Sequence, residues 1–308
     1  MDDKDCKLLL HVYEEKNITR AAERMHISQP ALSYRLQQLE AEFGMPIFIK
    51  HGKGIKFTPE GEYLVGFARK MVLELRKVKD HMSNMANEVK GTLKLGVSNH
   101  FAHYKLPPLL KSFLDGYPDV NITLETGYSS TIYQLLNDET VDVGIISGNY
   151  QWFDQKYLIY RNRITVISKE KINLDDLPNL PRIHYRTPRH TANIKYKTDL
   201  LLPQVIEDWW QERFTQAPTY SMQVDNAESC KEMVRYGFGY AIIPRTCLKQ
   251  HDNFHTIDLS YQNGQELSRN TWMHYKEASI QSSVVKTFVN YIKAFYLLDG
   301  PEEASPTP

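Results

Sequence analysis

The stretch of sequence that decides the fold is Ile27-Ser28-Gln29-Pro30-Ala31-Leu32-Ser33-Tyr34-Arg35-Leu36-Gln37-Gln38-Leu39-Glu40. Pro30 stands one residue inside a predicted helix, behind Ser28, whose hydroxyl can accept a hydrogen bond from a free amide. Leu32, Leu36 and Leu39 recur at helical spacing and predict one buried face. The opposite face is polar, so the stretch is predicted to be a short helix that can read bases.

A second short helix precedes this one. Residues 17–25 place Ala21 and Ala22 on a packing face, with Thr19 near the start of the helix, and a turn around His26 separates it from the next helix. Two short helices joined by a tight turn are typical of a helix-turn-helix, which lays its second helix in the major groove of DNA.

Residues 47–58 alternate apolar and basic side chains around two glycines, which predicts a two-stranded wing with a basic tip. A basic hairpin can be nothing more than a solvated loop. Directly after a helix-turn-helix, however, the duplex backbone is within its reach, which favours contact with phosphates or the minor groove. Residues 1–58 are therefore predicted to be a winged helix-turn-helix domain.

The candidate DNA-binding residues lie on the second helix, on the wing and at the start of the first helix. Arg35 could chelate guanine or contact a phosphate, whereas Thr19 and the wing lysines would fix the register on the backbone. The full set is Thr19, Ser28, Gln29, Pro30, Ser33, Tyr34, Arg35, Lys50 and Lys53.

A long helix is predicted from Pro59, with Thr58 as its cap. Its apolar residues follow at spacings of three and four, which is typical of a heptad seam: Leu64, Phe67, Met71, Leu75, Val78, Met82 and Met85. The alternative is an ordinary amphipathic helix buried on its own domain. The length and narrow stripe favour a dimerising linker over residues 59–88, and a dimer would supply the two recognition helices that a DNA site with dyad symmetry requires.

Beyond residue 89 predicted strands and helices alternate, which favours an α/β domain with a parallel sheet. We predict two lobes with a ligand cleft between them, lobe I over about 91–161 and 268–298 and lobe II over about 162–267, and a disordered tail over 299–308. The predicted strands are 93–98, 120–125, 141–146, 163–167, 183–185, 220–224, 240–243 and 271–275, and the helices are 106–113, 132–136, 205–210, 227–236 and 284–297.

Residues 2–61 resemble the N-terminal signature of LysR-type transcriptional regulators. The motifs that carry the resemblance are Asn17-Ile18-Thr19-Arg20-Ala21-Ala22, Ser28-Gln29-Pro30-Ala31-Leu32-Ser33, Leu36 with Leu39-Glu40, Phe48 with Lys50, and Lys53 through Thr58-Pro59-Glu60-Gly61. A looser match runs through Gly127-Tyr128-Ser129, Val141-Asp142-Val143-Gly144 and residues 233–244. The chain departs from the family pattern at Lys50 and Lys53, where Arg is common, and at Tyr34-Arg35.

The resemblance implies a winged-helix homodimer or homotetramer that binds double-stranded promoter DNA. It implies a C-terminal domain similar to periplasmic solute-binding proteins, with a small co-inducer as its ligand and no other cofactor. RNA polymerase would be a further partner if the protein is an activator.

Ligands of α/β domains sit at the carboxyl ends of strands, where helix N-termini offer free amides. The polar residues at such positions are Ser98, Asn99, Tyr128, Ser129, Ser147, Tyr185 and Asn226, and they are the candidate effector-binding residues. Residues 182–197 carry basic side chains and no acid, which suggests an organic anion as the ligand, although a solvated loop would look the same.

Composition excludes several classes of protein. The 37 Lys plus Arg equal the 37 Asp plus Glu, so there is no global basic field, but residues 16–58 carry seven basic and three acidic residues. The N-terminus lacks a signal peptide pattern and the chain lacks a long apolar stretch, so we expect a cytoplasmic protein with no membrane partner. Neither a nucleophile elbow nor a dinucleotide fingerprint occurs, so an enzyme is not expected.

Three alternatives stay open. His100 and His103 could belong to a metal site, but no further ligand stands near them in the sequence and none is predicted. Cys230 and Cys247 could form a thiol switch if their sulfurs approach each other. The two-lobed half by itself would suit a cytoplasmic solute-binding protein that binds no DNA.

Overall fold

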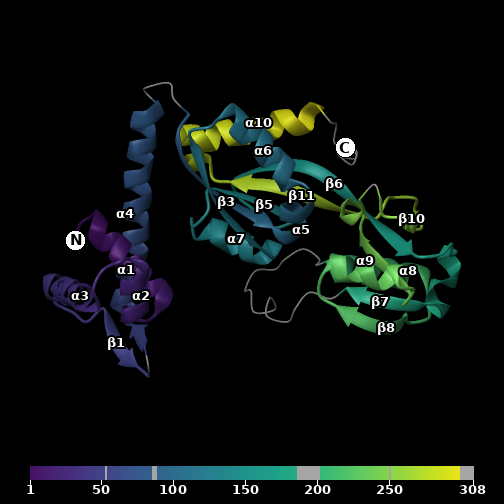
Figure 1. Cartoon of the computed structure of the whole chain (residues 1–308), viewed down its shortest axis with the longest axis horizontal. Coiled ribbons are helices and arrows are strands. Elements are labelled where there is room, and N and C mark those ends of the chain that lie inside the picture. The colour runs from purple at the N-terminus through teal and green to yellow at the C-terminus, as the bar shows by residue number, and fades with distance from the viewer. Residues whose placement is uncertain (53, 85–88, 186–201, 250, 299–308) are drawn as a thin grey trace. The chain divides into compact units, whose positions relative to one another are not determined.

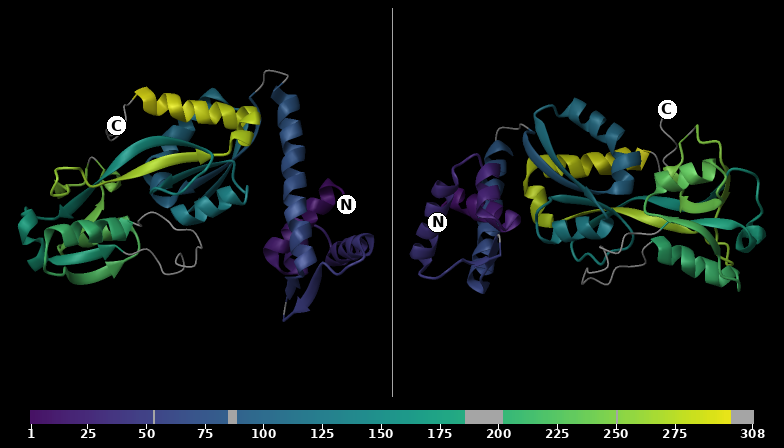
Figure 2. Two further views of the ribbon diagram at one scale, coloured as in Figure 1. Left: turned by 180° about the vertical axis from the view of Figure 1, so that it is seen from behind. Right: turned by 60° about the horizontal axis from the view of Figure 1, so that its bottom comes forward.

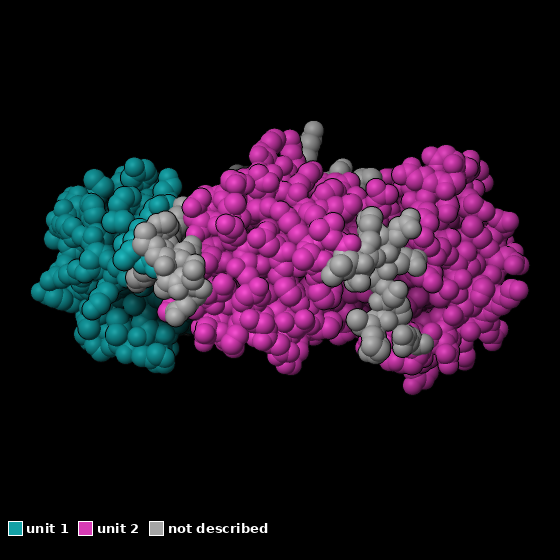
Figure 3. Space-filling view, turned by 90° about the horizontal axis from the view of Figure 1, so that it is seen from above, with its two compact units in different colours: residues 1–87 teal, residues 88–308 magenta. Residues whose placement is uncertain are grey.

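The computed structural model describes residues 1–52, 54–84, 89–185, 202–249 and 251–298. The chain forms two compact units, Met1–Asn87 and Glu88–Pro308, which Figure 1 shows as ribbons and Figure 3 as surfaces. The first unit contains α1 (Asp3–Glu15), α2 (Ile18–Arg24), α3 (Gln29–Phe43), β1 (Phe48–His51), β2 (Gly54–Phe57) and α4 (Pro59–Asn84).

The helix-turn-helix is built as the sequence predicts, with one change at its start. Asn17, rather than Thr19, caps α2, and its side chain accepts a hydrogen bond from the Arg20 amide. His26 has a φ of 55° in the turn, and the Ser28 hydroxyl then caps α3 by accepting from the Ala31 amide. The three leucines of α3 are fully buried against α1 and α2, which leaves the polar face of α3 outward.

The wing is anchored to the loop that joins α1 and α2. Strands β1 and β2 pair antiparallel, with Phe48 opposite Phe57, and the Ile55 amide donates to the Lys16 carbonyl over 2.9 Å. A Cβ at Gly54 would lie 2.4 Å from that carbonyl oxygen, so only glycine allows this approach. Lys53, at the predicted basic tip, lies outside the described residues.

Helix α4 starts where the sequence places it, and its first turns are buried. The Thr58 hydroxyl accepts from the Gly61 amide over 3.0 Å, and Leu64, Val65 and Ala68 join the core of the first unit. The rest of the predicted seam that the structure describes is an exposed apolar stripe, formed by Phe67, Met71, Leu75, Val78 and Met82. Met85 lies outside the described part of the chain.

The second unit alternates strands and helices. Its elements are β3 (Gly91–Ser98), α5 (Asn99–Tyr104), α6 (Leu106–Gly116), β4 (Val120–Gly127), α7 (Ser129–Asn137), β5 (Val143–Ser147), β6 (Gln155–Ser168), β7 (Pro181–Tyr185), α8 (Leu202–Arg213), β8 (Thr219–Val224), α9 (Ala227–Arg235), β9 (Tyr240–Pro244), β10 (His255–Asp258), β11 (Ser268–Tyr275) and α10 (Ser283–Leu298), with the 3-10 helices η1 (Leu174–Asn179), η3 (Arg245–Cys247) and η4 (Glu277–Gln281).

The strands form one sheet in the order β4-β3-β5-β11-β6-β9-β7-β8, with β10 paired to β6. Helices α6 and α10 cover one face of the β3–β5 half and α7 covers the other, whereas α8 and α9 cover opposite faces of the β7–β9 half. The domain is therefore two α/β lobes, and the predicted fold class is confirmed.

The lobes are joined by long strands rather than by loops, as both views of Figure 2 show. The first half of β6 pairs with β11, and its second half pairs with β9 and β10. The sequence predicts this strand only from residue 163, so its first half is not predicted, and neither are α5 and β10. The predicted disordered tail, 299–308, lies outside the described residues. In the part of the chain that is described, no helix has both the length and the apolar character needed to span a bilayer.

Candidate functional site

The outward face of α3 carries most of the side chains that the sequence singled out for DNA. Gln29 donates to the Ser33 hydroxyl over 2.8 Å, which orders both side chains on one face of the helix. Ser28, Pro30 and Tyr34 are exposed, as are Thr19 on α2 and Lys50 on β1. The structure thus brings a polar patch together on α3 and leaves it open to a partner.

Arg35 is placed differently from what the sequence suggested. Its guanidinium makes a bidentate ion pair with Asp5 of α1, at 2.5 and 2.7 Å, and also donates to the Gln38 side chain. Burial opposes ionisation of Asp5, but the hydrogen bonds from Arg35 and from the Asp2 backbone prevail and lower the pKa of its carboxyl. Arg35 therefore fixes α3 against α1, and in this arrangement its guanidinium is engaged within the protein rather than held ready for a base.

The second unit contains a cavity of about 530 Å³ between its lobes. All seven residues that the sequence proposed for the effector line it: Ser98, Asn99, Tyr128, Ser129, Ser147, Tyr185 and Asn226. They come together because β3, β5 and β7 end at the cavity and because α5, α7 and α9 begin there. A volume of this size suits a small organic molecule.

One lining residue that the sequence does not predict is Arg269 of β11. Its Nη2 donates to the Ser147 carbonyl over 2.9 Å, but its Nε is buried without a hydrogen-bond partner among the described residues. Burial lowers the pKa of Arg269, and no carboxylate forms an ion pair with it in the described part of the chain. An isolated arginine in a strand more than 100 residues from Ser147 gives no local signal in the sequence.

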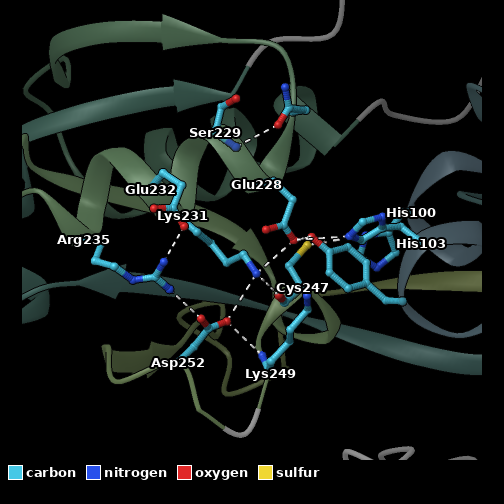
Figure 4. Close-up of polar contacts among 12 residues, drawn as sticks. His100, His103, Glu228, Ser229, Lys231, Glu232, Arg235, Cys247, Lys249 and Asp252 are labelled. Carbon is cyan, nitrogen blue, oxygen red and sulfur yellow. Dashed lines mark hydrogen bonds and ion pairs between the residues drawn. The ribbon is translucent and has the colours of Figure 1, made fainter.

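A polar network joins the two lobes at the edge of the cavity (Figure 4). Tyr104 of α5 donates to the Glu228 carboxylate at the start of α9, and Lys231 binds the same carboxylate over 3.0 Å. The Lys231 ammonium is buried, and it also contacts the Cys247 carbonyl and the Asp252 carboxylate. This network is satisfied internally, so a ligand would have to compete with existing contacts there.

Arg182 and His184, the described basic side chains of the predicted anion-binding stretch, do not line the cavity. Arg182 is buried between the rings of Trp210 and Tyr220, with centroid distances of 5.4 and 5.7 Å. Residues 186–201, which hold most of the predicted positive excess, lie outside the described residues. Arg182 thus serves the core of lobe II through cation–π contacts.

Cys230, Cys247 and His100 sit in settings that suit packing. Burial raises the pKa of Cys230 to about 12 and also raises the pKa of Cys247, which is the opposite of what a reactive thiolate needs. Burial lowers the pKa of His100 to about 3, and His100 hydrogen-bonds Thr246 and Asn162. Within the described residues no group of three potential metal ligands occurs.

Comparison with known proteins matches both units. Residues 4–62 match the model of the bacterial regulatory helix-turn-helix proteins of the lysR family, and residues 86–296 match the LysR substrate binding domain. The chain belongs to the LysR family of transcriptional regulators. It is a DNA-binding regulator with an effector-binding domain, and because the family is not enzymatic, the prediction that the chain is no enzyme is confirmed.

Two relatives from Bacillus subtilis strain 168 span nearly the whole chain. The chain is 43% identical to the uncharacterized HTH-type transcriptional regulator YraN, over 95% of this chain and 98% of the relative, and 33% identical to the uncharacterized regulator YkuM, over 98% and 100%. Among solved structures, full-length OxyR C199D from Pseudomonas aeruginosa matches with a TM-score of 0.67 at 19% identity and covers 95% of each chain. Full-length CbnR complexed with its target DNA matches with a TM-score of 0.62 at 19% identity, over 96% of this chain and 99% of CbnR. Both solved structures are similar to this chain in fold.

Proposed function

We propose that this LysR-type regulator binds a promoter site of dyad symmetry through paired copies of α3, and that a small organic anion in the inter-lobe cavity controls promoter binding or activation. The observation that carries the proposal is that side chains from both lobes meet around one cavity in the domain that the family uses for effectors. A ligand that contacts both lobes binds one lobe arrangement better than another, which is the physical requirement for control.

At the DNA end, Gln29, Ser33 and Tyr34 contact base edges, and Pro30 lies against a thymine methyl. Ser28, Thr19 and the wing lysines Lys50 and Lys53 contact phosphates or the minor groove and set the register. Arg35 acts indirectly by holding α3 on α1 through Asp5. The exposure of the Gln29, Pro30 and Tyr34 side chains supports this assignment.

The assembly that binds DNA is a homodimer or a homotetramer. The exposed apolar stripe on α4 would be buried if two copies of α4 packed along it as a coiled coil. Two recognition helices held in this way match a site with dyad symmetry. RNA polymerase is a further partner if the protein activates transcription.

The test begins with sequencing of the genomic DNA fragments that the purified full-length protein retains in the presence of excess non-specific DNA. We expect a small set of fragments with a common dyad-symmetric motif, and we expect their affinity to fall steeply as salt rises. Retention of random fragments only would contradict sequence-specific reading.

The cavity is tested with the best of these fragments. Ser129→Phe should fill part of the cavity and abolish the response of DNA binding to small molecules, whereas Thr140→Phe, at an exposed site in lobe I, should leave it intact. An unchanged response in Ser129→Phe would place the controlling ligand elsewhere.

A thiol-based regulator is the second candidate function, and the structure gives it less support. The pKa of both lobe II thiols is raised by burial, and Cys247 already contacts the His100 ring at 3.5 Å. Unchanged DNA binding after peroxide treatment in the wild type would remove this candidate.

A further inference from the structure

Arg269 is a half-buried cation that has no partner of opposite charge among the described residues. It lies in β11, beside the end of β5, and its Nη2 is tied to the Ser147 carbonyl. Its Nε is buried and makes no hydrogen bond to any described residue. Among the described residues, the guanidinium donates only to the neutral Ser147 carbonyl. Withdrawing an uncompensated charge from water is unfavourable, and natural structures usually compensate such a charge with a carboxylate or a ligand.

The groups around Arg269 point to an anion as the missing partner. The N-terminus of the nine-residue helix α7 opens at Ser129, whose hydroxyl already accepts from the Ser147 amide over 3.1 Å. Ser98 lines the same cavity, is 3% exposed, and its hydroxyl has no partner within the described parts of the chain. A guanidinium, a free hydroxyl and helix amides around one cavity are the donors that bind a carboxylate.

The charge of the described lining bears on how many negative charges the ligand carries. Among the described residues, and apart from the histidines, the charged lining residues are Arg269, Asp225 and Glu228. Glu228 is already compensated by Lys231, which leaves one cation and one acid in the described lining. Within the described lining, a second negative charge on the ligand would meet no further cation and would face the Asp225 carboxylate.

We propose that Arg269 is the residue that recognises the effector, that it binds the effector's carboxylate together with Ser98 and the N-terminus of α7, and that the effector is a monoanion. This inference rests on the proposed function, because it assumes that the cavity is the effector site. It sharpens that function by naming the recognising cation, which lies outside the basic stretch of residues 182–197.

The experiment measures binding of simple probes to the full-length protein by thermal shift and calorimetry. Each monocarboxylate is paired with its neutral amide: acetate with acetamide, butyrate with butyramide, and benzoate with benzamide, and succinate serves as the dianion. We expect at least one monocarboxylate to bind the wild type, its amide to bind at least tenfold more weakly, and succinate to bind no better than butyrate.

Arg269→Gln should weaken binding of the positive probe at least tenfold, whereas the matched control Arg213→Gln, on the outer surface of lobe II, should leave it unchanged. Without ligand, Arg269→Gln should melt at the temperature of the wild type or above it, because an uncompensated charge has been removed. If Arg269→Gln does not fold, Arg269→Lys keeps the charge and loses the planar fork, and it should bind the carboxylate more weakly than the wild type.

Three results would overturn the inference: no monocarboxylate binds, an amide binds as well as its acid, or the Arg269 variants bind as the wild type does. If the amides bind as well as the acids and also change DNA affinity, the cavity is the effector site but its ligand is not recognised as an anion. If a carboxylate binds through Arg269 but never changes DNA affinity, the cavity is an anion site but does not control DNA binding.

Discussion

At the scale of single residues, the pairing of Arg35 with Asp5 changes how the recognition helix is understood. The sequence shows Arg35 among residues that face DNA, and nothing local distinguishes it from Gln29 or Tyr34. Its partner stands 30 positions earlier and is buried at the N-terminus of α1. Sequence periodicity finds the face of a helix, but it does not find a contact of this kind because contacts between distant segments depend on packing.

Gln29→Ala should weaken specific binding relative to non-specific binding by about 1 to 3 kcal/mol, because a base-edge contact is lost while the phosphate contacts remain. Competitive gel shift on a selected fragment measures this ratio. The thermal stability of the first unit should not change, since Gln29 is exposed. An unchanged ratio would remove Gln29 from the set of base-reading residues.

Arg35→Ala should instead lower the thermal stability of the first unit, because it leaves the Asp5 carboxylate buried without its partner. The double variant Asp5→Ala/Arg35→Ala should recover part of that loss. A double-mutant cycle on the melting temperature tests the coupling. If Arg35→Ala melts as the wild type does but loses specific DNA binding, Arg35 reads DNA directly.

His274 provides a pH test at the same scale. It is buried and stacked on Trp152, and burial lowers its pKa to about 4. Above about pH 6.5 the His274 imidazole is neutral in both the folded and the unfolded state. Between about pH 6.5 and pH 4 only the unfolded state gains a proton. The free energy of unfolding therefore falls by about 1.4 kcal/mol per pH unit in this window.

His274→Gln should therefore show a shallower loss of stability between pH 6 and about pH 4.5 in denaturant titrations of the second unit. His100, whose pKa is also lowered, contributes the same slope to both proteins. Identical slopes for the two proteins would show that His274 titrates normally.

At the scale of secondary-structure elements, the sequence predicts elements that have a local periodic pattern, but it does not predict pairing between distant strands. The heptad spacing predicted α4, and the alternation of apolar and basic residues predicted the wing. The first half of β6 was missed because residues 155–162 pair with β11, more than 100 positions later, across a register shift at Thr271/Trp272. Arg269 was not predicted for the same reason, because it stands more than 100 positions from Ser147. The strand ends that line the cavity, in contrast, could each be predicted from their own local sequence.

The exposed stripe of α4 leads to a prediction about assembly. Leu75→Glu should place a charge in the coiled-coil seam and shift the protein toward monomer, with loss of dyad-symmetric DNA binding. Lys70→Glu, also on α4 but outside the stripe, should keep the assembly. Sedimentation equilibrium measures both, and an unchanged mass for Leu75→Glu would mean that α4 does not dimerise through this stripe.

At the scale of the whole molecule, we propose that a ligand in the cavity of the second unit controls DNA binding by the first unit. The two lobes that line the cavity are connected by the continuous strands β6 and β11 and bridged by Tyr104 and Glu228. A ligand bound between the lobes can therefore bias their arrangement. Effectors of this kind typically change a second affinity by about 5- to 150-fold.

The most direct test of the account is the dissociation constant for a selected promoter fragment, measured with and without the monocarboxylate that binds the protein best. We predict a change of about 5-fold or more in the wild type, in either direction, and no change in Arg269→Gln. An equal dissociation constant with and without saturating carboxylate in the wild type would contradict control of DNA binding from this cavity.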